Sequence, residues 1–147
     1  FTNTVVIMTS NLGSQQLMAA SSREEGEALV REVITASFKP EFINRLDEII
    51  VFNRLGSEQV HAIVTLQLKA LGERLKGRGY TLSWDDAVVD AIYDEGYDPL
   101  YGARPIRRAI QRMVEDSLSV LLLGGSFAEG AKIHLSMEGS TVVAHAL

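Results

Sequence analysis

The sequence predicts two parts of different fold class: an α/β segment over residues 1–55 and an α+β domain over residues 56–147. Two short continuous apolar runs with a helical pattern between them indicate buried strands of a parallel sheet in the first part. In the second part, long amphipathic patterns and a terminal hairpin pattern indicate three helices and a small three-stranded sheet. The turn-rich segment 53–56 separates the two parts.

In the first part, the apolar run at residues 4–9 predicts a strand that ends in the turn cluster 10–14. A helical pattern follows over residues 23–38 and is broken by Pro40, which also suits the first position of a short helix over 40–46. Residues 48–52 predict a second strand. Two strands cannot make a stable sheet alone, so this part reads as a fragment of a larger sheet.

In the second part, Ser57 suits the N-cap of a helix that ends at Gly77 and Gly79. Its apolar side chains recur at helical spacing and are Val60, Ile63, Val64, Leu68, Leu71 and Leu75. Residues 80–84 predict a short strand, and Asp85 begins a second helix.

The loop 96–102 leads to Pro105, which suits the first turn of a third helix that continues to about residue 121. Gly124 and Gly125 end this helix. Residues 132–137 and 141–145 predict a hairpin.

Composition narrows the classes of function. The chain has 147 residues, no cysteine and a net charge of −5. Disulfides and cysteine-ligated metals are excluded, and the negative charge argues against a dedicated nucleic-acid binder. The longest apolar run, residues 120–123, is far shorter than the ~20 residues that span a bilayer. We therefore expect a cytoplasmic protein, and because Phe1 is followed at once by a strand pattern, we expect a piece of a longer chain.

Asn11 is the first candidate site residue. It follows the predicted strand 4–9, and polar residues at the carboxyl ends of such strands face the crevice where open α/β sheets bind ligands. Its amide can hold a water or a phosphate oxygen. Alternatively, its side chain stabilises the turn by bonding to the backbone.

Arg45 is the second candidate. An arginine held rigidly at an edge can reach a phosphate on another chain, since its planar fork matches phosphate oxygens. Alternatively, Arg45 forms a surface ion pair with Glu41, which lies four residues earlier on the predicted short helix.

Arg104 is the third candidate, next to Gly102 and Ala103 and before Pro105. A cation at the start of a helix is unfavourable unless an anion such as phosphate lies nearby. Its face of the helix is basic and also carries Arg107, Arg108 and Arg112. This face is alternatively solvated, or paired with the acidic stretch 85–98 of another subunit, or, less in keeping with the net charge, bound to nucleic acid.

Other signals are negative. The sequence contains no G-x-x-x-x-G-K-[ST] phosphate loop. His61, His134 and His145 do not cluster at ligand spacing, and no Ser/His/Asp arrangement is indicated. We therefore predict no metal site and no catalytic centre complete within this chain.

Three segments occur in an order and spacing that resemble the C-terminal end of Clp-family AAA+ ATPases: residues 6–13 (VIMTSNLG), 38–47 (FKPEFINRLD) and 96–105 (GYDPLYGARP). The resemblance covers essentially the whole chain and is greatest to the ClpB-type disaggregase branch, in the second AAA+ module. It implies that residues 1–55 are the end of the large α/β subdomain and residues 56–147 the small C-terminal subdomain.

The resemblance also implies roles. Asn11 matches the sensor-1 asparagine, Arg45 the arginine finger that reaches the ATP of the neighbouring subunit, and Arg104 the sensor-2 arginine, with Gly102 and Ala103 beside the nucleotide. The family uses ATP with Mg²⁺, forms homohexamers in the stress response and threads misfolded or aggregated polypeptides with a DnaK-type chaperone system. Both Walker motifs lie outside this chain, so the isolated chain is predicted to be inactive as an ATPase.

One feature separates branches of the family, and another departs from the pattern of a second interface arginine. Protease-partner relatives of the ClpA/ClpC type resemble this chain but carry an Ile-Gly-Phe or Ile-Gly-Leu loop, which the interval 14–38 lacks. Lys39 stands where many relatives have arginine, and lysine supplies a charge without the bidentate fork. A non-catalytic oligomerisation module is the alternative from another class.

Overall fold

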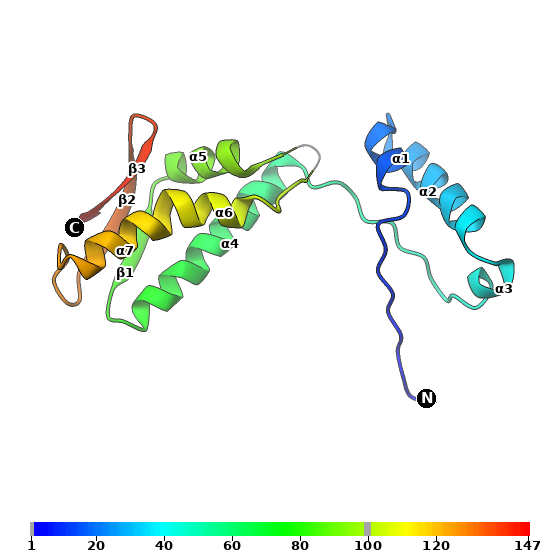
Figure 1. Ribbon diagram of the computed structural model, residues 1–147, viewed down its shortest axis with the longest axis horizontal. Coiled ribbons are helices and arrows are strands. Elements are labelled where there is room, and N and C mark those ends of the chain that lie inside the picture. The colour runs from blue at the N-terminus through cyan, green and yellow to red at the C-terminus, as the bar shows by residue number, and fades with distance from the viewer. Residues whose placement is uncertain (1, 99–100) are drawn as a thin grey trace. The chain divides into compact units, whose positions relative to one another are not determined.

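The computed structural model describes residues 2–98 and 101–147. The chain divides into two compact units, which we call the first unit (Phe1–Asn53) and the second unit (Arg54–Leu147). Each is described by itself (Figure 1). Among the helices of the described residues, none combines the length and the apolar character that a membrane span requires.

The first unit is built on a helical hairpin of α1 (Ser14–Ala19) and α2 (Arg23–Ser37). The two helices approach closely at Gly26, where an added Cβ would lie 2.8 Å from Leu17 Cδ1 and the leucine side chain would have to shift. Ser22 caps α2 by accepting a 3.2 Å hydrogen bond from the backbone N–H of Glu25. The predicted helix over 23–38 is thus confirmed, whereas α1 follows the predicted turn 10–14 in a segment for which no helix was predicted.

The strands predicted at residues 4–9 and 48–52 are not formed: both segments run without strand pairing. Val5, Val6 and Ile7 are 84–86% exposed, and Phe52 is 80% exposed. Their apolar character fits a strand that is buried on both faces, but a strand also needs neighbours for its backbone hydrogen bonds. The described part of the first unit offers no such neighbour.

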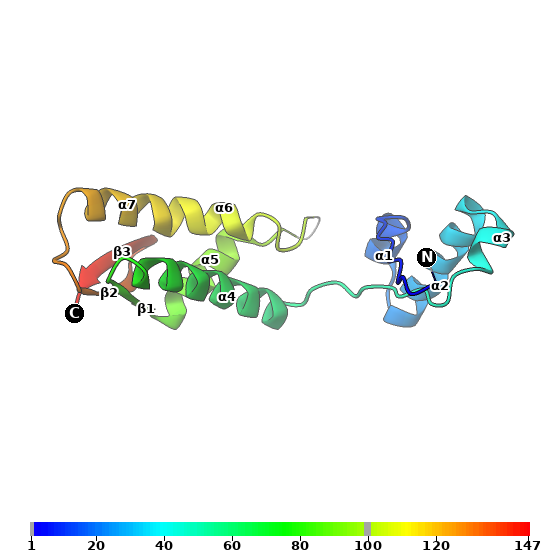
Figure 2. The ribbon, with the colours of Figure 1, turned by 90° about the horizontal axis from the view of Figure 1, so that it is seen from below.

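The described residues of the second unit form three helical rods, which Figure 2 shows. They are α4 (Ser57–Lys76), α5 (Asp86–Gly96) and a continuous rod of α6 (Ile106–Ile110), the π-helical turn η1 (Gln111–Glu115) and α7 (Asp116–Leu123). The N-cap predicted at Ser57 belongs instead to Gly56, because the helix already includes Ser57. The predicted three helices are confirmed.

The π-helical turn fits the spacing of the buried side chains of this rod. The buried and half-buried positions of this rod recur four residues apart, as in Ile110, Val114 and Leu118. In an α-helix of 3.6 residues per turn, such a pattern drifts around the axis by about 40° at each step. The wider π turn at 111–115 removes part of that drift and keeps these side chains facing the core.

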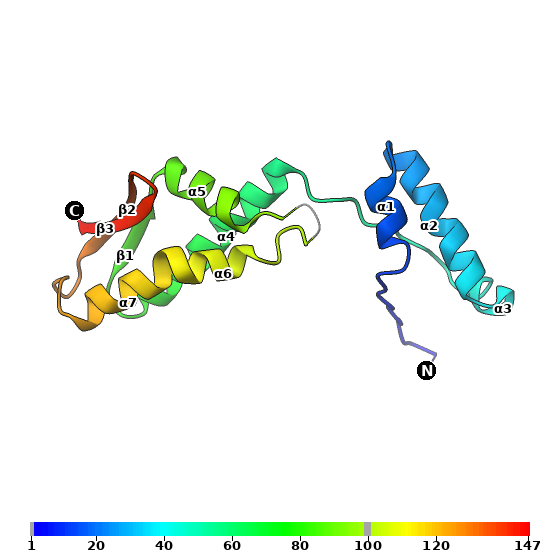
Figure 3. The same cartoon turned by 45° about the horizontal axis from the view of Figure 1, so that its top comes forward.

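The sheet contains β1 (Thr81–Trp84), β2 (Lys132–Glu138) and β3 (Thr141–Ala146), in the order β1-β2-β3. β1 and β2 are parallel, and β2 and β3 form the predicted antiparallel hairpin. Burial alternates along β2: Ile133 and Leu135 are buried and His134 is half-buried. The helices cover the apolar face (Figure 3).

The core of the second unit lies between these rods and the sheet. Its largest fully buried side chains are Leu68, Ile92, Ile106, Ile133, Leu135, Val60, Val64, Val88 and Val114. Gly96 is required where α5 meets α6, since an added Cβ would lie 2.9 Å from the Cα of Ile106. This close crossing fixes the start of α6 beside the loop that precedes it.

Candidate functional site

Asn11 lies in the turn that leads into α1. Two serines hold this turn: the backbone N–H of Leu12 donates to Ser10 Oγ at 3.1 Å, and Ser14 Oγ donates to the carbonyl of Asn11 at 2.5 Å. The amide side chain of Asn11 makes no hydrogen bond within residues 2–98 and 101–147. The side chain of Asn11 therefore does not stabilise the turn by a hydrogen bond to a described residue, and its amide is exposed.

Gly13 fixes the position of this turn against α2. Its φ of +77° is in the left-handed region, which favours glycine. An added Cβ would lie 2.9 Å from Val30 Cγ2 and 3.2 Å from Val30 Cα. The turn that carries Asn11 is thereby seated against the middle of α2.

Arg45 follows α3 (Pro40–Ile43), a single turn that begins on its proline. The backbone N–H of Arg45 donates to the carbonyl of Phe42 at 3.1 Å, which continues the turn beyond the helix. The rings of Phe38 and Phe42 stack with centroids 5.1 Å apart. The backbone that leads to Arg45 is thus held by a proline, a hydrogen-bonded turn and an aromatic stack.

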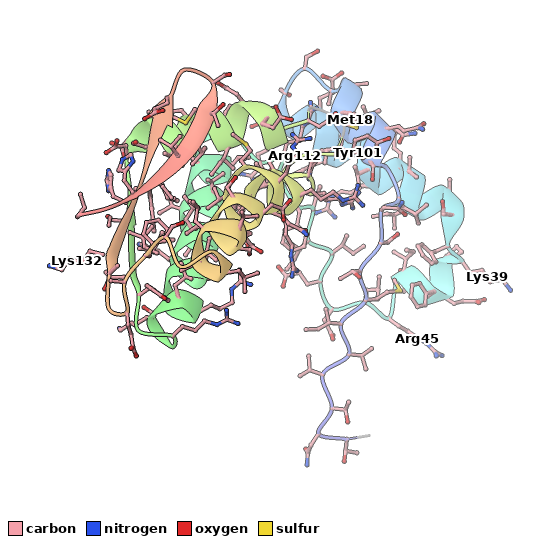
Figure 4. All side chains as sticks on the ribbon, turned by 60° about the vertical axis from the view of Figure 1, so that its left-hand side comes forward. Met18, Lys39, Arg45, Tyr101, Arg112 and Lys132 are labelled. Carbon is pink, nitrogen blue, oxygen red and sulfur yellow. The ribbon has the colours of Figure 1, made fainter. Side chains whose placement is uncertain are left out.

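The side chain of Arg45 is exposed and forms no ion pair with any described residue. The alternative pairing with Glu41 is absent, because the helix ends at Ile43, earlier than the predicted 46, and the two side chains no longer share helical spacing. Figure 4 shows Lys39 and Arg45 both projecting away from the ribbon. This segment therefore presents two exposed cationic side chains.

Arg104 lines an open hollow of about 320 Å³ together with Tyr101, Pro105 and Arg108. The loop before it is closed by a bridge between Asp98 and Gly102, and Gly102 has a φ of +62°. Asp98 Oδ1 also accepts a 3.1 Å hydrogen bond from the backbone N–H of Tyr101.

Within this loop, Ala103 is half-buried and packs against the core. Pro99 and Leu100, part of the predicted loop and of the third quoted segment, lie outside the described residues.

The four arginines of the predicted basic face differ in their partners. Arg112 forms an ion pair with Glu95 of α5 in the same chain. The side chains of Arg104, Arg107 and Arg108 form no ion pair with residues that the structure describes. Part of the charge pairing expected between subunits is thus satisfied within one chain. The three arginines near the start of the rod have no such partner among the described residues.

The described residues hold no group of three or more His, Cys, Asp or Glu side chains that could bind a metal ion. The structure nevertheless contains a contact that sequence reasoning missed. Ser83 Oγ lies 2.9 Å from His134 Nδ1, and His134 Nε2 lies 3.2 Å from Asp85 Oδ1. These side chains lie on the sheet face opposite the core and do not line the hollow beside Arg104. We therefore read them as a structural network.

Sequence reasoning placed Asn11 and Arg45 in one part and Arg104 in the other, and the structure has Asn11 and Arg45 in the first unit and Arg104 in the second. No hydrogen bond or ion pair joins Asn11 to Arg45 among the described residues. The structure adds Arg108 and Tyr101 to the surroundings of Arg104. The four-residue spacing of Arg104 and Arg108 is the sequence signal for this neighbourhood.

Comparison with known proteins assigns both parts of the chain. Residues 55–135 match the family model of the C-terminal, D2-small domain, of ClpB protein, and residues 1–49 match that of the AAA domain (Cdc48 subfamily). The chain is 46% identical over 144 residues to the chaperone protein ClpB of Pseudomonas putida, which covers 97% of this chain and 17% of that relative.

Two further relatives agree. The chaperone protein ClpB of Vibrio cholerae is 44% identical over 147 residues, or 98% of this chain and 17% of the relative. The chaperone protein ClpB of Rhizobium meliloti is 47% identical over 136 residues, which are 90% of this chain and 16% of the relative. The chain thus spans about 17% of the length of the curated relatives it matches. The chain therefore belongs to the ClpB family, as a C-terminal segment of its second AAA+ module, D2.

Proposed function

We propose that this chain supplies sensor 1, the arginine finger, sensor 2 and part of the ring-assembly surface of a homohexameric, ATP-dependent protein disaggregase. In the complete protein, ATP hydrolysis would drive the threading of misfolded or aggregated polypeptides. The first unit is the end of the large AAA+ subdomain and the second unit is the small C-terminal subdomain. Membership of the ClpB family supports this proposal.

The observation that carries the proposal is the side chain of Arg45, which has no ion-pair partner among the described residues. Its guanidinium is exposed, its backbone is held by the turn after α3, and Glu41 does not neutralise it. Phosphoryl transfer depends on positioning and charge stabilisation, which an arginine from a neighbouring subunit supplies. In other nucleotide hydrolases such a finger contributes roughly 10³–10⁵ in rate.

Asn11 and Arg104 have complementary roles. The free amide of Asn11 would orient the attacking water or a γ-phosphate oxygen. Arg104 would hold the phosphates of its own subunit's nucleotide, with Gly102 and Ala103 shaping the backbone beside them. Each side chain lacks a partner among the residues that the structure describes, which suits groups that are completed by a ligand.

The residues of the hollow fit the phosphates rather than the metal. Two arginines and a tyrosine line it together with a proline, and cations do not ligate Mg²⁺. ATP with Mg²⁺ would supply the γ-phosphoryl group, with the metal held by carboxylates or hydroxyls elsewhere. Since the sequence lacks a phosphate loop, we propose that the isolated chain does not hydrolyse ATP.

The disaggregase branch is favoured over the protease-partner branch by the segment between Asn11 and Arg45. The helical hairpin of α1 and α2 occupies this interval, and only residues 20–22 separate the two helices. No Ile-Gly-Phe or Ile-Gly-Leu sequence occurs there. This supports action with a DnaK-type chaperone system in the cytoplasm rather than delivery to a peptidase.

The test places the chain in a full-length carrier, the ClpB of Pseudomonas putida with its matching segment replaced by this sequence and the ATP site of its first AAA+ module inactivated, so that turnover and nucleotide binding report on the second module. ATP turnover is compared for the unchanged carrier, Arg45→Ala and the control Arg31→Ala, with ring mass measured on the same samples. Arg31 is an exposed arginine of the first unit that is also unpaired among described residues. We expect Arg45→Ala to lower turnover at least about 100-fold with the ring intact, and Arg31→Ala to leave it unchanged.

Unchanged turnover in Arg45→Ala, in a carrier that is active without the substitution, would contradict the finger. It would favour the alternative in which this segment only assembles the ring. Loss of the hexamer in Arg45→Ala would point to the same alternative.

A further inference from the structure

We propose that Arg108 is a second phosphate-binding residue, which forms a two-arginine clamp with Arg104 on the terminal phosphates of a nucleoside triphosphate. The inference rests on the proposed role of Arg104 and adds a residue to that site. Its basis is the hollow of about 320 Å³ that both arginines line with Tyr101 and Pro105.

Arg104 and Arg108 line the same hollow at the start of the rod. Arg108 lies within α6. Long side chains on a helix lean toward its N-terminus, so Arg108 extends over the turn below it, toward Arg104. Arg104 lies in the turn just before α6, and Pro105 fixes the start of the rod.

The charges of the rod separate Arg108 from the other arginines. Arg112, one turn farther along, forms an ion pair with Glu95 of α5. Arg107 is exposed and unpaired among described residues, but it does not line the hollow. Arg104 and Arg108 therefore form a pair of like charges beside one hollow, with no described carboxylate lining it.

Phosphate suits this pair because of its shape and charge. Two cationic side chains that border one hollow favour an anion within it, because each is attracted to the anion and the two cations repel each other. A terminal phosphate presents several oxygens, and each arginine can bind two of them in a forked hydrogen bond. The phenol of Tyr101, which is 60% exposed as a residue, borders the hollow and adds a neutral hydrogen-bond donor.

The experiment measures nucleotide affinity in the full-length carrier, by displacement of a fluorescent ADP with the slowly hydrolysed analogue ATPγS. The variants are Arg104→Ala, Arg108→Ala and Arg108→Lys, with Arg107→Ala as the matched control on the same turn. We expect Arg108→Ala to weaken ATPγS binding about tenfold, the effect of one charge-assisted hydrogen bond. Arg108→Lys should lose about threefold, since lysine keeps the charge without the fork, and Arg107→Ala should stay within twofold.

The outcomes separate this inference from the proposed function. If Arg104→Ala weakens binding while Arg108→Ala matches Arg107→Ala, the clamp is wrong and the role of Arg104 stands. If neither Arg104→Ala nor Arg108→Ala changes affinity, the proposed sensor-2 role fails as well. If Arg108→Ala leaves affinity unchanged but lowers ring mass, Arg108 binds an acidic surface of a neighbouring subunit instead, which also overturns the clamp.

Discussion

The same residue type has opposite environments in the two units. Val60 and Val64 of α4 are fully buried in the second unit, whereas Val5 and Val6 of the first unit are 85% and 86% exposed. Valine is apolar in both places, so composition does not explain the difference. An amphipathic helix satisfies its own backbone hydrogen bonds and needs only a packing surface, which α5 and the third rod supply.

A strand has a further requirement. Its N–H and C=O groups are satisfied only by neighbouring strands, so the run at residues 4–9 needs both packing partners and a sheet. β1 has such a partner: its strand pairs with β2 over four residues, beginning with Thr81 and Lys132. The second unit is thus folded by contacts within itself, and the strand-like segments of the first unit depend on structure that its described residues do not provide.

The largest expected effect comes from separating the units. We expect residues 54–147 alone to unfold cooperatively, with the same denaturant midpoint as the whole chain, because their core lies within this unit. Residues 1–53 alone should show no cooperative transition. Circular dichroism during urea titration checks both. If residues 54–147 lose their cooperative transition when they are separated from residues 1–53, the second unit does not fold by itself and the comparison is wrong.

Matched substitutions of one isoleucine in each unit sharpen the comparison of the two units. Ile92 is fully buried and Ile7 is 84% exposed. Ile92→Ala should lower the free energy of unfolding by about 2–5 kcal/mol, the usual cost of emptying a core position. Ile7→Ala should change it by less than about 0.5 kcal/mol in the isolated chain. Equal losses for the two variants, measured by urea denaturation, would mean that residues 4–9 are packed.

Two glycines test close packing in each unit. In Gly96→Ala the new Cβ meets the backbone of Ile106 at 2.9 Å, which a side-chain rotation cannot relieve. We expect a loss of about 1–3 kcal/mol in the unfolding of the second unit.

In Gly13→Ala the new Cβ lies 2.9 Å from Val30 Cγ2, and alanine must adopt a φ of +77° that it disfavours. We expect this substitution to loosen α1 alone. Hydrogen exchange would report that loosening while the unfolding of the second unit stays unchanged. A loss of cooperativity in the second unit after Gly13→Ala would show that the units are energetically coupled.

The smallest expected effect concerns the ion pair between Glu95 and Arg112. The two side chains are 49% and 67% exposed, so solvent screens the pair. Glu95→Gln should cost less than about 1 kcal/mol, and about 1 M salt should remove the difference. Asp94→Asn is the control, because the side chain of Asp94 is exposed and forms no ion pair with described residues. A salt-independent loss in Glu95→Gln alone would indicate a stronger role for this contact.

Sequence patterns predicted the second unit well, because its signals are local. The apolar stripe of α4, the helix start near Pro105 and the hairpin 132–145 need no knowledge of distant residues. The sequence did not reveal the π turn at 111–115, which depends on packing against the sheet, or the parallel pairing of β1 with β2. It also favoured strands at 4–9 and 48–52. Both segments are apolar in sequence, but neither pairs with another strand in the structure.

The candidate site shows the same division. Asn11, Arg45 and Arg104 follow from motif order and from resemblance, and their roles remain predictions. The structure removed two competing interpretations: Asn11 does not bond its own turn, and Glu41 does not pair with Arg45 in the described chain. The place of Arg108 beside Arg104 required coordinates, because spacing alone does not form a hollow.

Subunit mixing tests the central claim most directly, that Arg45 acts on the nucleotide of a neighbouring subunit. Two inactive variants of the full-length carrier are mixed: Arg45→Ala, which keeps its own nucleotide site, and Asn11→Ala, which keeps its finger. If Arg45 acts across the interface, Asn11→Ala subunits will complete the sites of Arg45→Ala subunits, and mixed rings will regain ATP turnover. Mixed rings of confirmed hexameric mass that stay as inactive as either variant alone would contradict the account.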